Sequence, residues 1–312
     1  MSKIAIVQEP PVVLDKAATL ARAVGALGKT AAAGAKLVVF PETYIPGYPA
    51  WIWRLRPGED GRVFRDTYKR LLANAVDLGA GDLAPLQDAA AQHAVTVVVG
   101  YHERDAEFGR TTLYNGLAVI GADGAILNRH RKLMPTNPER MLWGLGDASG
   151  LRVVETPVGR LGALICWENL MPLSRYALYG DGVQVYCAPT YDSGDVWIAS
   201  MQHIAKEGGC WVLGAGSVLR GRDLPADFPE RDRLYPDADE WINPGDSVVV
   251  APGGRIVAGP MRRETGILYA DIDLDAIGPA RGGLDVVGHY ARPDVFQLSV
   301  NRRKAPPVSF ED

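Results

Sequence analysis

Short apolar runs of strand length, separated by stretches of helical periodicity and by tight turns, are the feature that most limits the fold of this chain. Residues 4–7, 37–40 and 96–100 are too short for helices and rich in branched side chains, which is typical of buried strands. Residues 15–33 instead carry apolar side chains at spacings of three and four, which predicts a helix. The alternation predicts an α/β protein.

Two strand pairs are joined by tight turns rather than by helices. Residues 117–120 and 125–131 flank Ala122-Asp123-Gly124, and residues 153–156 and 161–165 flank Pro157-Val158-Gly159. Antiparallel pairs within an alternating pattern predict layered sheets with helices outside, not a purely parallel doubly wound sheet. We expect further helices at 64–78, 83–93 and 196–207, and further strands at 183–187, 211–214, 247–250 and 267–272.

Length and charge exclude several classes of protein. The 312 residues are enough for one large α/β domain or two ordinary ones. With 33 basic and 37 acidic residues, the chain lacks the positive charge that nucleic-acid binding requires.

No segment approaches the ~20 apolar residues that span a bilayer. The N-terminus enters a strand pattern without a signal peptide, and three cysteines suit a reducing compartment. We expect a cytoplasmic protein without nucleic-acid or membrane partners.

Cys166 is the candidate nucleophile. It ends the buried strand predicted at 161–165 and precedes a turn and a helix, so its side chain can reach a ligand at the mouth of a sheet. Cys187 and Cys210 lie within strands that look buried, and we expect both thiols to be inert.

Two other strands end on the charged partners that a thiol needs. Glu42 follows the strand at 37–40, and Lys132 stands where the extended segment 125–131 gives way to a proline-broken loop. A carboxylate can take the thiol proton, and an ammonium can stabilise negative charge. His130 shares the strand face of Lys132, so a Cys–His hydrolase is the alternative mechanism.

Aromatic residues beside these strand ends are candidate substrate-binding groups. Tyr48 lies in the aromatic and proline-rich segment 44–53, which forms either a pocket wall or a loop packed within its own domain. Tyr191 follows the strand at 183–187 and either lines the pocket or packs in a loop. Trp167 offers a backbone N–H to negative charge on the substrate; alternatively, Trp167 and Glu168 pack and hydrogen-bond beneath the cysteine.

Cofactor and metal motifs are incomplete. Gly28-Lys29-Thr30 lacks the earlier glycine of a phosphate loop, and Gly144-x-Gly146 lacks the third glycine of a dinucleotide fingerprint. The remaining histidines lack metal-ligand spacing, so we expect no cofactor, no metal, and structural roles for His93, His102, His203 and His289.

Three motifs in this order resemble the nitrilase superfamily: Pro41-Glu42-Thr43, the His-Arg-Lys-Leu-x-Pro-Thr run from His130, and Cys166-Trp167-Glu168-Asn169. The Trp-Glu-Asn after the cysteine is similar to the nitrilase branch rather than the amidase branches. The resemblance runs from about residue 3 to 300 and includes Leu113-Tyr114-Asn115, Cys187-Ala188-Pro189-Thr190, Asn243-Pro244-Gly245-Asp246-Ser247 and the segment 285–294. It implies a four-layer αββα sandwich in one carbon-nitrogen hydrolase domain, residues 1–300, followed by a tail, residues 301–312.

The resemblance also implies residue roles. Cys166 is the nucleophile, Glu42 the general base, and Lys132 stabilises the thioimidate and tetrahedral intermediates, while Glu139 matches the family's second glutamate and orients the lysine and the substrate. An organic nitrile would become a carboxylic acid and ammonia through a thioimidate and a thioester. One alternative is a relative that hydrates cyanide or nitriles to amides. A second is an amidase or carbamoylase, which Trp167 disfavours. A third is a non-catalytic binding protein, which the joint presence of Glu42, Lys132 and Cys166 disfavours.

Residues 219–242 form a long polar stretch without periodicity. Large apolar groups interrupt it, and a solvated loop has little use for them: Leu224, Phe228, Leu234, Tyr235 and Trp241. We expect a homodimer or larger homo-oligomer with this stretch at a subunit contact. The competing account is a lid folded over the pocket of its own subunit.

Overall fold

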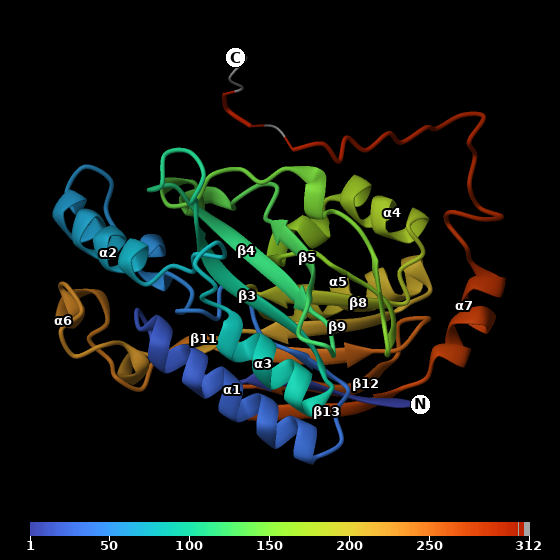
Figure 1. Ribbon diagram of the computed structural model, residues 1–312, viewed down its shortest axis with the longest axis horizontal. Helices are drawn as coiled ribbons and strands as arrows, with labels where there is room; N and C mark the ends of the chain where they lie inside the picture. Colours follow the sequence, from blue (N-terminus) through green and yellow to red (C-terminus); the bar gives the residue numbers. More distant parts are fainter. Residues whose placement is uncertain (305, 309–312) are drawn as a thin grey trace.

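Two β-sheets face each other, and helices cover their outer faces (Figure 1). The computed structural model describes residues 1–304 and 306–308. The first sheet has the strand order β13-β1-β2-β3-β4-β5, in which β1, β2 and β3 are parallel and the other pairs are antiparallel. Its strands are β1 (Ser2–Gln8), β2 (Leu37–Val39), β3 (Thr96–Arg104), β4 (Leu113–Ile120), β5 (Ile126–Arg131) and β13 (Gly266–Ile272).

The second sheet has the order β10-β11-β9-β8-β7-β6, with β12 paired to β11. Here β7, β8 and β9 are parallel to one another. Its strands are β6 (Val154–Thr156), β7 (Gly159–Ala163), β8 (Val185–Thr190), β9 (Trp211–Gly216), β10 (Val218–Arg220), β11 (Trp241–Val250) and β12 (Ile256–Arg262).

Alternating side chains divide the interior into three hydrophobic layers. In β1, Ile4 and Ile6 point between the two sheets, whereas Ala5 and Val7 point toward the outer helices. Strands buried on both faces read as continuous apolar runs, which explains the sequence pattern.

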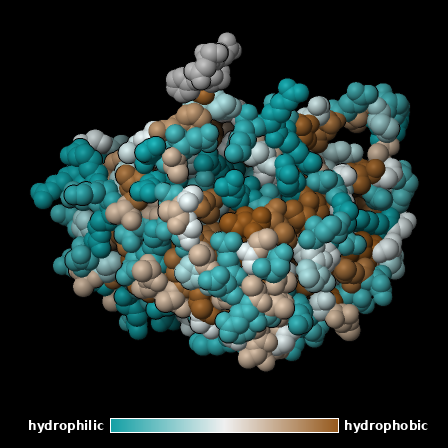
Figure 2. Space-filling view, in the orientation of Figure 1, coloured by the Kyte–Doolittle hydropathy of each residue, from teal (hydrophilic) through white to brown (hydrophobic). Residues whose placement is uncertain are grey.

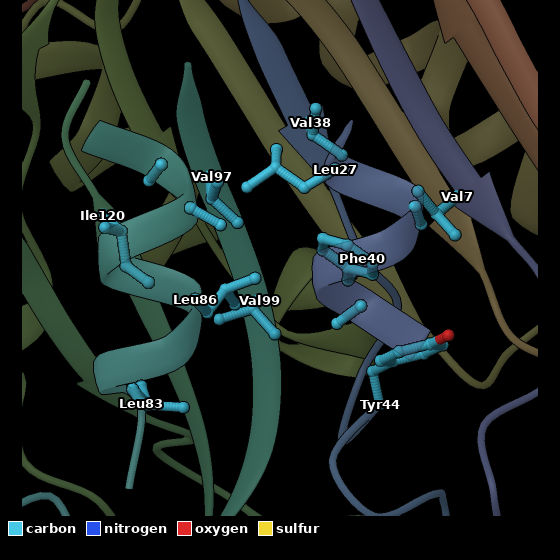
Figure 3. Close-up of a cluster of buried hydrophobic side chains, with 14 of the residues drawn as sticks. Val7, Leu27, Val38, Phe40, Tyr44, Leu83, Leu86, Val97, Val99 and Ile120 are labelled. Atoms are coloured by element: carbon cyan, nitrogen blue, oxygen red, sulfur yellow. The ribbon is translucent and has the colours of Figure 1, made fainter. Parts of the chain in front are cut away.

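The outer layers consist of two helices each. On the first sheet, α1 (Lys16–Ala32) and α3 (Ala84–His93) pack Leu27 and Leu86 against strand residues such as Val97 (Figure 3). On the second sheet, α4 (Pro172–Gly180) and α5 (Asp195–Gly208) do the same. The predicted four-layer αββα class is therefore confirmed. The remaining helices are α2 (Gly61–Ala73), α6 (Arg231–Leu234) and α7 (Ile277–Gly283).

Several element boundaries differ from the sequence expectations. The helix expected at 64–78 is α2, which ends at Ala73, because Val76 pairs with the edge of β3 through the backbone of His102 and Arg104. The turn at 121–125 joins β4 to β5 as expected. Gly124 is required there, since its φ is +84° and a Cβ would lie 2.8 Å from the Gln87 carbonyl oxygen.

The segment 219–242 packs on its own chain. The side chains of Leu224, Phe228, Leu234 and Tyr235 are buried, and the ring of Phe228 lies 5.3 Å from that of Trp51. The segment was expected at a subunit interface because these apolar groups would otherwise face solvent. Their burial within the same chain removes that reason. Phe228 covers Trp51 of segment 44–53, and the competing account, a lid folded over the pocket of its own subunit, stays a prediction.

The expected tail at 301–312 is described in part. Residues 301–304 and 306–308 contain no helix or strand, and Arg302 donates a 2.9 Å hydrogen bond to Asp181. Residues 305 and 309–312 lie outside the described residues. None of the helices in the described ranges has the length and apolar character needed to cross a membrane.

Candidate active site

Glu42 stands at the end of β2 in a tight turn that lies against β3. A Cβ on Gly100 would lie 2.4 Å from the Pro41 carbonyl oxygen and 2.5 Å from the Thr43 nitrogen, so the turn needs glycine at this position. Thr43 adopts a left-handed conformation, with φ at +45°. A left-handed residue other than glycine is typical of functional sites, and the neighbouring Glu42 carboxylate is buried.

Lys132 follows β5 and is 1% exposed. Its Nζ donates hydrogen bonds of 2.8 Å to Glu42 Oε1 and 2.8 Å to Glu139 Oε2. A buried ammonium between two carboxylates is compensated for its lost hydration. The structure therefore brings together three of the residues expected in the site.

Each oxygen of Glu42 has a fixed donor. Oε1 also accepts a 2.7 Å hydrogen bond from Asn115 Nδ2, and Oε2 accepts one of 2.7 Å from the Tyr191 backbone. These bonds come from different strands or strand ends, and they hold the carboxylate in one orientation.

Glu139 lies in the 3-10 helix η2 (Asn137–Met141) and is buried, unlike an ordinary loop glutamate. Besides Lys132, it accepts 2.7 Å hydrogen bonds from the Thr136 backbone and from the Tyr48 hydroxyl. Tyr48 thus contacts Glu139 directly, and its role in binding substrate stays a prediction.

Cys166 begins the 3-10 helix η4 (Cys166–Leu170) immediately beyond β7. Its φ is +52°, and its side chain is almost fully buried. Asn169 Nδ2 donates 2.7 Å to the Cys166 carbonyl, and Tyr186 donates 2.7 Å to Asn169 Oδ1. The N–H groups of Cys166 and Trp167 lie in the first turn, where a helix provides no acceptor of its own, so they are available to a ligand.

Burial is the main reason why the Cys166 thiol is protonated at rest. Burial raises the pKa of Cys166, and the negative charge of Glu42 raises it further, whereas Lys132 and Thr190 lower it. Burial also raises the pKa of Glu42, against the lowering effect of Lys132. Burial alone would lower the pKa of Lys132, but Glu42, Cys166 and Glu139 reverse this, so the lysine stays charged.

His130 has a different partner from the one that the Cys–His alternative needs. Its Nε2 lies 3.0 Å from both carboxylate oxygens of Glu168. Glu168 also accepts hydrogen bonds from the backbones of Leu133 at 2.7 Å and Ile165 at 2.8 Å. Glu168 therefore lies beneath the site and joins the segment that carries Lys132 to the segment that carries the cysteine.

Trp167 does not pack beneath the cysteine with Glu168. Its side chain is 43% exposed, and Nε1 donates a 2.8 Å hydrogen bond to Asp192. The positive φ of Cys166 turns the chain at this point. The ring of Trp167 therefore lies at the surface, where an incoming substrate can contact it.

The stacked rings of Tyr48 and Tyr191 close one side of the site. Their centroids are 3.6 Å apart, and their planes differ by 8°. Beside them is a cavity of about 10 Å³ lined in part by Glu42 and Leu219, which is room for about one water molecule. Segment 44–53 therefore both packs within its own chain and forms a wall, and Tyr191 contacts Glu42 through its backbone.

Several polar residues of the site had no role predicted from the sequence. Asn115 and Asn169 donate hydrogen bonds to Glu42 and to the cysteine carbonyl, and Thr190 lowers the pKa of the Cys166 thiol. All three residues belong to motifs that carried the family resemblance. A polar residue at the end of an apolar strand is the sequence signal that could have identified Asn115 and Thr190 as site residues.

The other candidates remain outside the site. Cys187 and Cys210 are unpaired and buried, and burial raises the pKa of Cys210 to about 12, which keeps its thiol protonated. Within residues 1–304 and 306–308, no group of three histidine, cysteine or acidic side chains is placed to hold a metal.

Comparison with known proteins shows the family of this chain. The model of the carbon-nitrogen hydrolase family matches residues 3–282. The chain is 41% identical to the bifunctional nitrilase/nitrile hydratase NIT4A of Lupinus angustifolius, covering 98% of this chain and 87% of that protein. It is also 41% identical to nitrilase 3 of Arabidopsis thaliana, covering 99% and 89%.

Solved structures share the fold at lower identity. A carbon-nitrogen hydrolase from Helicobacter pylori G27 superposes with a TM-score of 0.70 at 19% identity, over 94% of this chain and 96% of that one. Yeast Nit3, from Saccharomyces cerevisiae, gives a TM-score of 0.68 at 21% identity, over 93% and 96%. The chain belongs to the carbon-nitrogen hydrolase family, and its sequence groups with the nitrilases.

Proposed function

We propose that this protein is a nitrilase that converts an organic nitrile and two water molecules into a carboxylic acid and ammonia. The observation that carries the proposal is the buried Glu42–Lys132–Glu139 cluster, whose charges shift the pKa of the Cys166 thiol. The nitrilases among its relatives support the choice of a nitrile as substrate.

The first step is proton transfer coupled to attack. Because the Cys166 thiol is protonated at rest and Glu42 has a raised pKa, the carboxylate takes the proton as sulfur bonds to the nitrile carbon. Negative charge then develops on the nitrile nitrogen. The Lys132 ammonium and the Trp167 backbone N–H are the donors that stabilise it, and the proton returns to nitrogen to give a thioimidate.

The later steps reuse the same groups. Glu42 takes a proton from water as the water oxygen adds to the thioimidate carbon, which gives a tetrahedral intermediate that Lys132 stabilises. Protonation of its nitrogen releases ammonia and leaves a thioester. A second water, activated by Glu42, breaks the carbon–sulfur bond, which releases the acid and restores the thiol.

Amide release is the second candidate outcome of the same intermediate. If the carbon–sulfur bond breaks before the carbon–nitrogen bond, the product is an amide and only one water is consumed. The name of the lupin relative, a bifunctional nitrilase/nitrile hydratase, supports measuring both products.

The test is product release from a panel of aliphatic and aromatic nitriles, with amides included. We expect ammonia and acid from nitriles, and loss of both in Cys166→Ala with an unchanged circular dichroism spectrum. Cys187→Ala is the matched control, since it removes a buried thiol outside the site. Turnover retained by Cys166→Ala would exclude this cysteine as the nucleophile, and turnover of amides alone would replace the nitrilase proposal with an amidase.

We also propose one hydrolase unit over residues 1–300, located in the cytoplasm and assembled as a homodimer or larger homo-oligomer. The family match and the shared core between the sheets support the single unit. Three unpaired cysteines support a reducing compartment. Exposed apolar residues on and before α4 support a subunit contact there: Leu170, Met171, Leu173 and Tyr176.

A further inference from the structure

His102 is a fully buried histidine in β3 that takes no part in the proposed chemistry. Its Nε2 lies 3.0 Å from the Gly47 carbonyl oxygen, and Trp143 Nε1 lies 3.0 Å from its Nδ1. An indole N–H can only donate, so Nδ1 must be the acceptor. The ring proton is therefore on Nε2, which donates to Gly47.

This tautomer is neutral, and the surroundings keep it so. Burial lowers the pKa of His102 to about 3, against a smaller raising effect of the Gly47 carbonyl. A protonated ring would place a donor on Nδ1 against the indole donor of Trp143. The ring therefore provides one donor and one acceptor at a fixed separation.

Both partners of His102 contact Tyr48. Gly47 precedes it in the chain, and the Trp143 ring packs edge-on against the Tyr48 ring at 5.9 Å between centroids. The Trp143 backbone N–H also donates 3.0 Å to the Glu139 carbonyl. A contiguous set of contacts thus leads from His102 to the Tyr48 hydroxyl, and from there to the Glu139 carboxylate.

We propose that His102 is a positioning residue that ties the Gly47 peptide to the Trp143 indole, and so holds the Tyr48 hydroxyl on the carboxylate that orients Lys132. The inference rests on the proposed function, because it assigns His102 to the support of that site. A misplacement of about 1 Å far from the reacting atoms can cost up to about 10²-fold in rate.

The first test is kinetic. We expect His102→Leu, which removes both bonds, to lower kcat by about 10- to 100-fold with little change in KM. His102→Asn retains an acceptor near the Nδ1 position, and His102→Gln retains a donor near the Nε2 position, so each should recover part of the loss. Tyr101→Phe is the matched control on the same strand, because the buried Tyr101 hydroxyl has no partner in the described structure.

A double-mutant cycle separates positioning from general destabilisation. If His102 acts through Tyr48, then His102→Leu should have little further effect on kcat in a Tyr48→Phe background. Losses that multiply would overturn the proposal, as would a His102→Leu enzyme with normal kcat. If His102→Leu does not fold, Trp143→Phe carries the same test, since it keeps a ring and removes the indole donor.

The tautomer is tested without activity. In the full-length protein labelled with ¹⁵N-histidine, at neutral pH, we expect His102 to carry a proton on Nε2 and a bare Nδ1, its signal being assigned by its loss in His102→Asn. A proton on Nδ1 would overturn the inference even if nitriles are hydrolysed. Absence of nitrile turnover with the expected tautomer would instead count against the proposed function, and the cycle would then be run on the amide that the enzyme accepts.

Discussion

In the proposed mechanism, Glu42 and Lys132 activate the Cys166 thiol without an imidazole. The lysine is charged because two carboxylates surround it, and one of them, Glu42, also has a raised pKa. A base whose pKa is closer to that of the thiol takes the proton more readily. The pair therefore combines a proton acceptor with a fixed positive charge for the intermediates.

This arrangement predicts a difference between two substitutions. Glu42→Gln is nearly isosteric but cannot take a proton, so it should lower kcat by about 10² to 10⁴. His130→Asn should cost much less, because the histidine is bonded to Glu168. Initial rates of ammonia release measure both. An active Glu42→Gln enzyme together with an inactive His130→Asn enzyme would establish the Cys–His mechanism instead.

At the scale of elements, Glu168 connects the two halves of the sandwich beneath the site. It receives backbone hydrogen bonds from Leu133 after β5 and Ile165 after β7, one from each sheet, and it pairs with His130. Burial alone would raise the pKa of Glu168, but His130 and the two backbone donors outweigh it, and the net pKa lies below its ordinary value of 4.5.

The lowered pKa of Glu168 predicts a pH-dependent contribution to stability. A carboxylate with a depressed folded-state pKa stabilises the fold above its unfolded pKa, and this stabilisation is lost as the pH falls through the folded value. Glu168→Gln should therefore lower the free energy of unfolding by about 1.5–3 kcal/mol at pH 7, the range for losing a hydrogen bond to a buried charged group. The difference from wild type should shrink below pH 4.5.

Urea denaturation at pH 7 and at pH 4 measures this difference. Glu155→Gln is the control, because Glu155 pairs with Arg160 at the surface with a side chain that is 75% exposed. Its loss should cost at most about 1 kcal/mol. A Glu168→Gln difference of the same size at both pH values would show that its charge does not contribute.

The elements that sequence predicted are those with local periodicity. Strand β1 and helix α1 are apolar or amphipathic along their length, and their positions are confirmed within two residues. The first half of β11 and all of β12 were missed. Asn243, Pro244 and Gly245 interrupt the apolar pattern of β11, and its pairing with β12 is irregular, with several register shifts.

The residues of the site were likewise predicted where the signal is local in the sequence, and missed where it is not. Cys166, Glu42 and Lys132 could be named because each ends a strand within a recognisable motif. The hydrogen bonds from Asn115 and Tyr191 to Glu42 could not, because they join residues 73 and 149 positions apart. The exposure of Trp167 depends on the backbone of Cys166, and a left-handed cysteine leaves no mark in composition or periodicity.

At the scale of the whole molecule, two apolar regions have different surroundings. Leu224, Phe228, Leu234 and Tyr235 of segment 219–242 are buried in one cluster with residues of segment 44–53. The outward face of α4 instead exposes Leu173, at 67%, and Tyr176. Figure 2 shows that hydrophobic residues also gather in a band across one face of the molecule. Exposed apolar patches mark contact surfaces, so α4 is a better candidate for a subunit contact than segment 219–242.

The two regions therefore predict opposite results for the mass of the particle in solution. Leu173→Glu places a charge in the proposed contact and should lower the mass measured by light scattering toward that of a single chain.

Phe228→Ala should leave the mass unchanged and lower the thermal stability, because it opens a cavity against Trp51 that costs about 3–5 kcal/mol. Tyr269→Glu, at an exposed position on β13 in the other sheet, is the control for adding a charge. If the mass falls with Phe228→Ala and not with Leu173→Glu, the subunit contact involves segment 219–242 rather than α4. A wild-type protein with the mass of one chain would exclude the oligomer, and the site would then have to work within a single subunit.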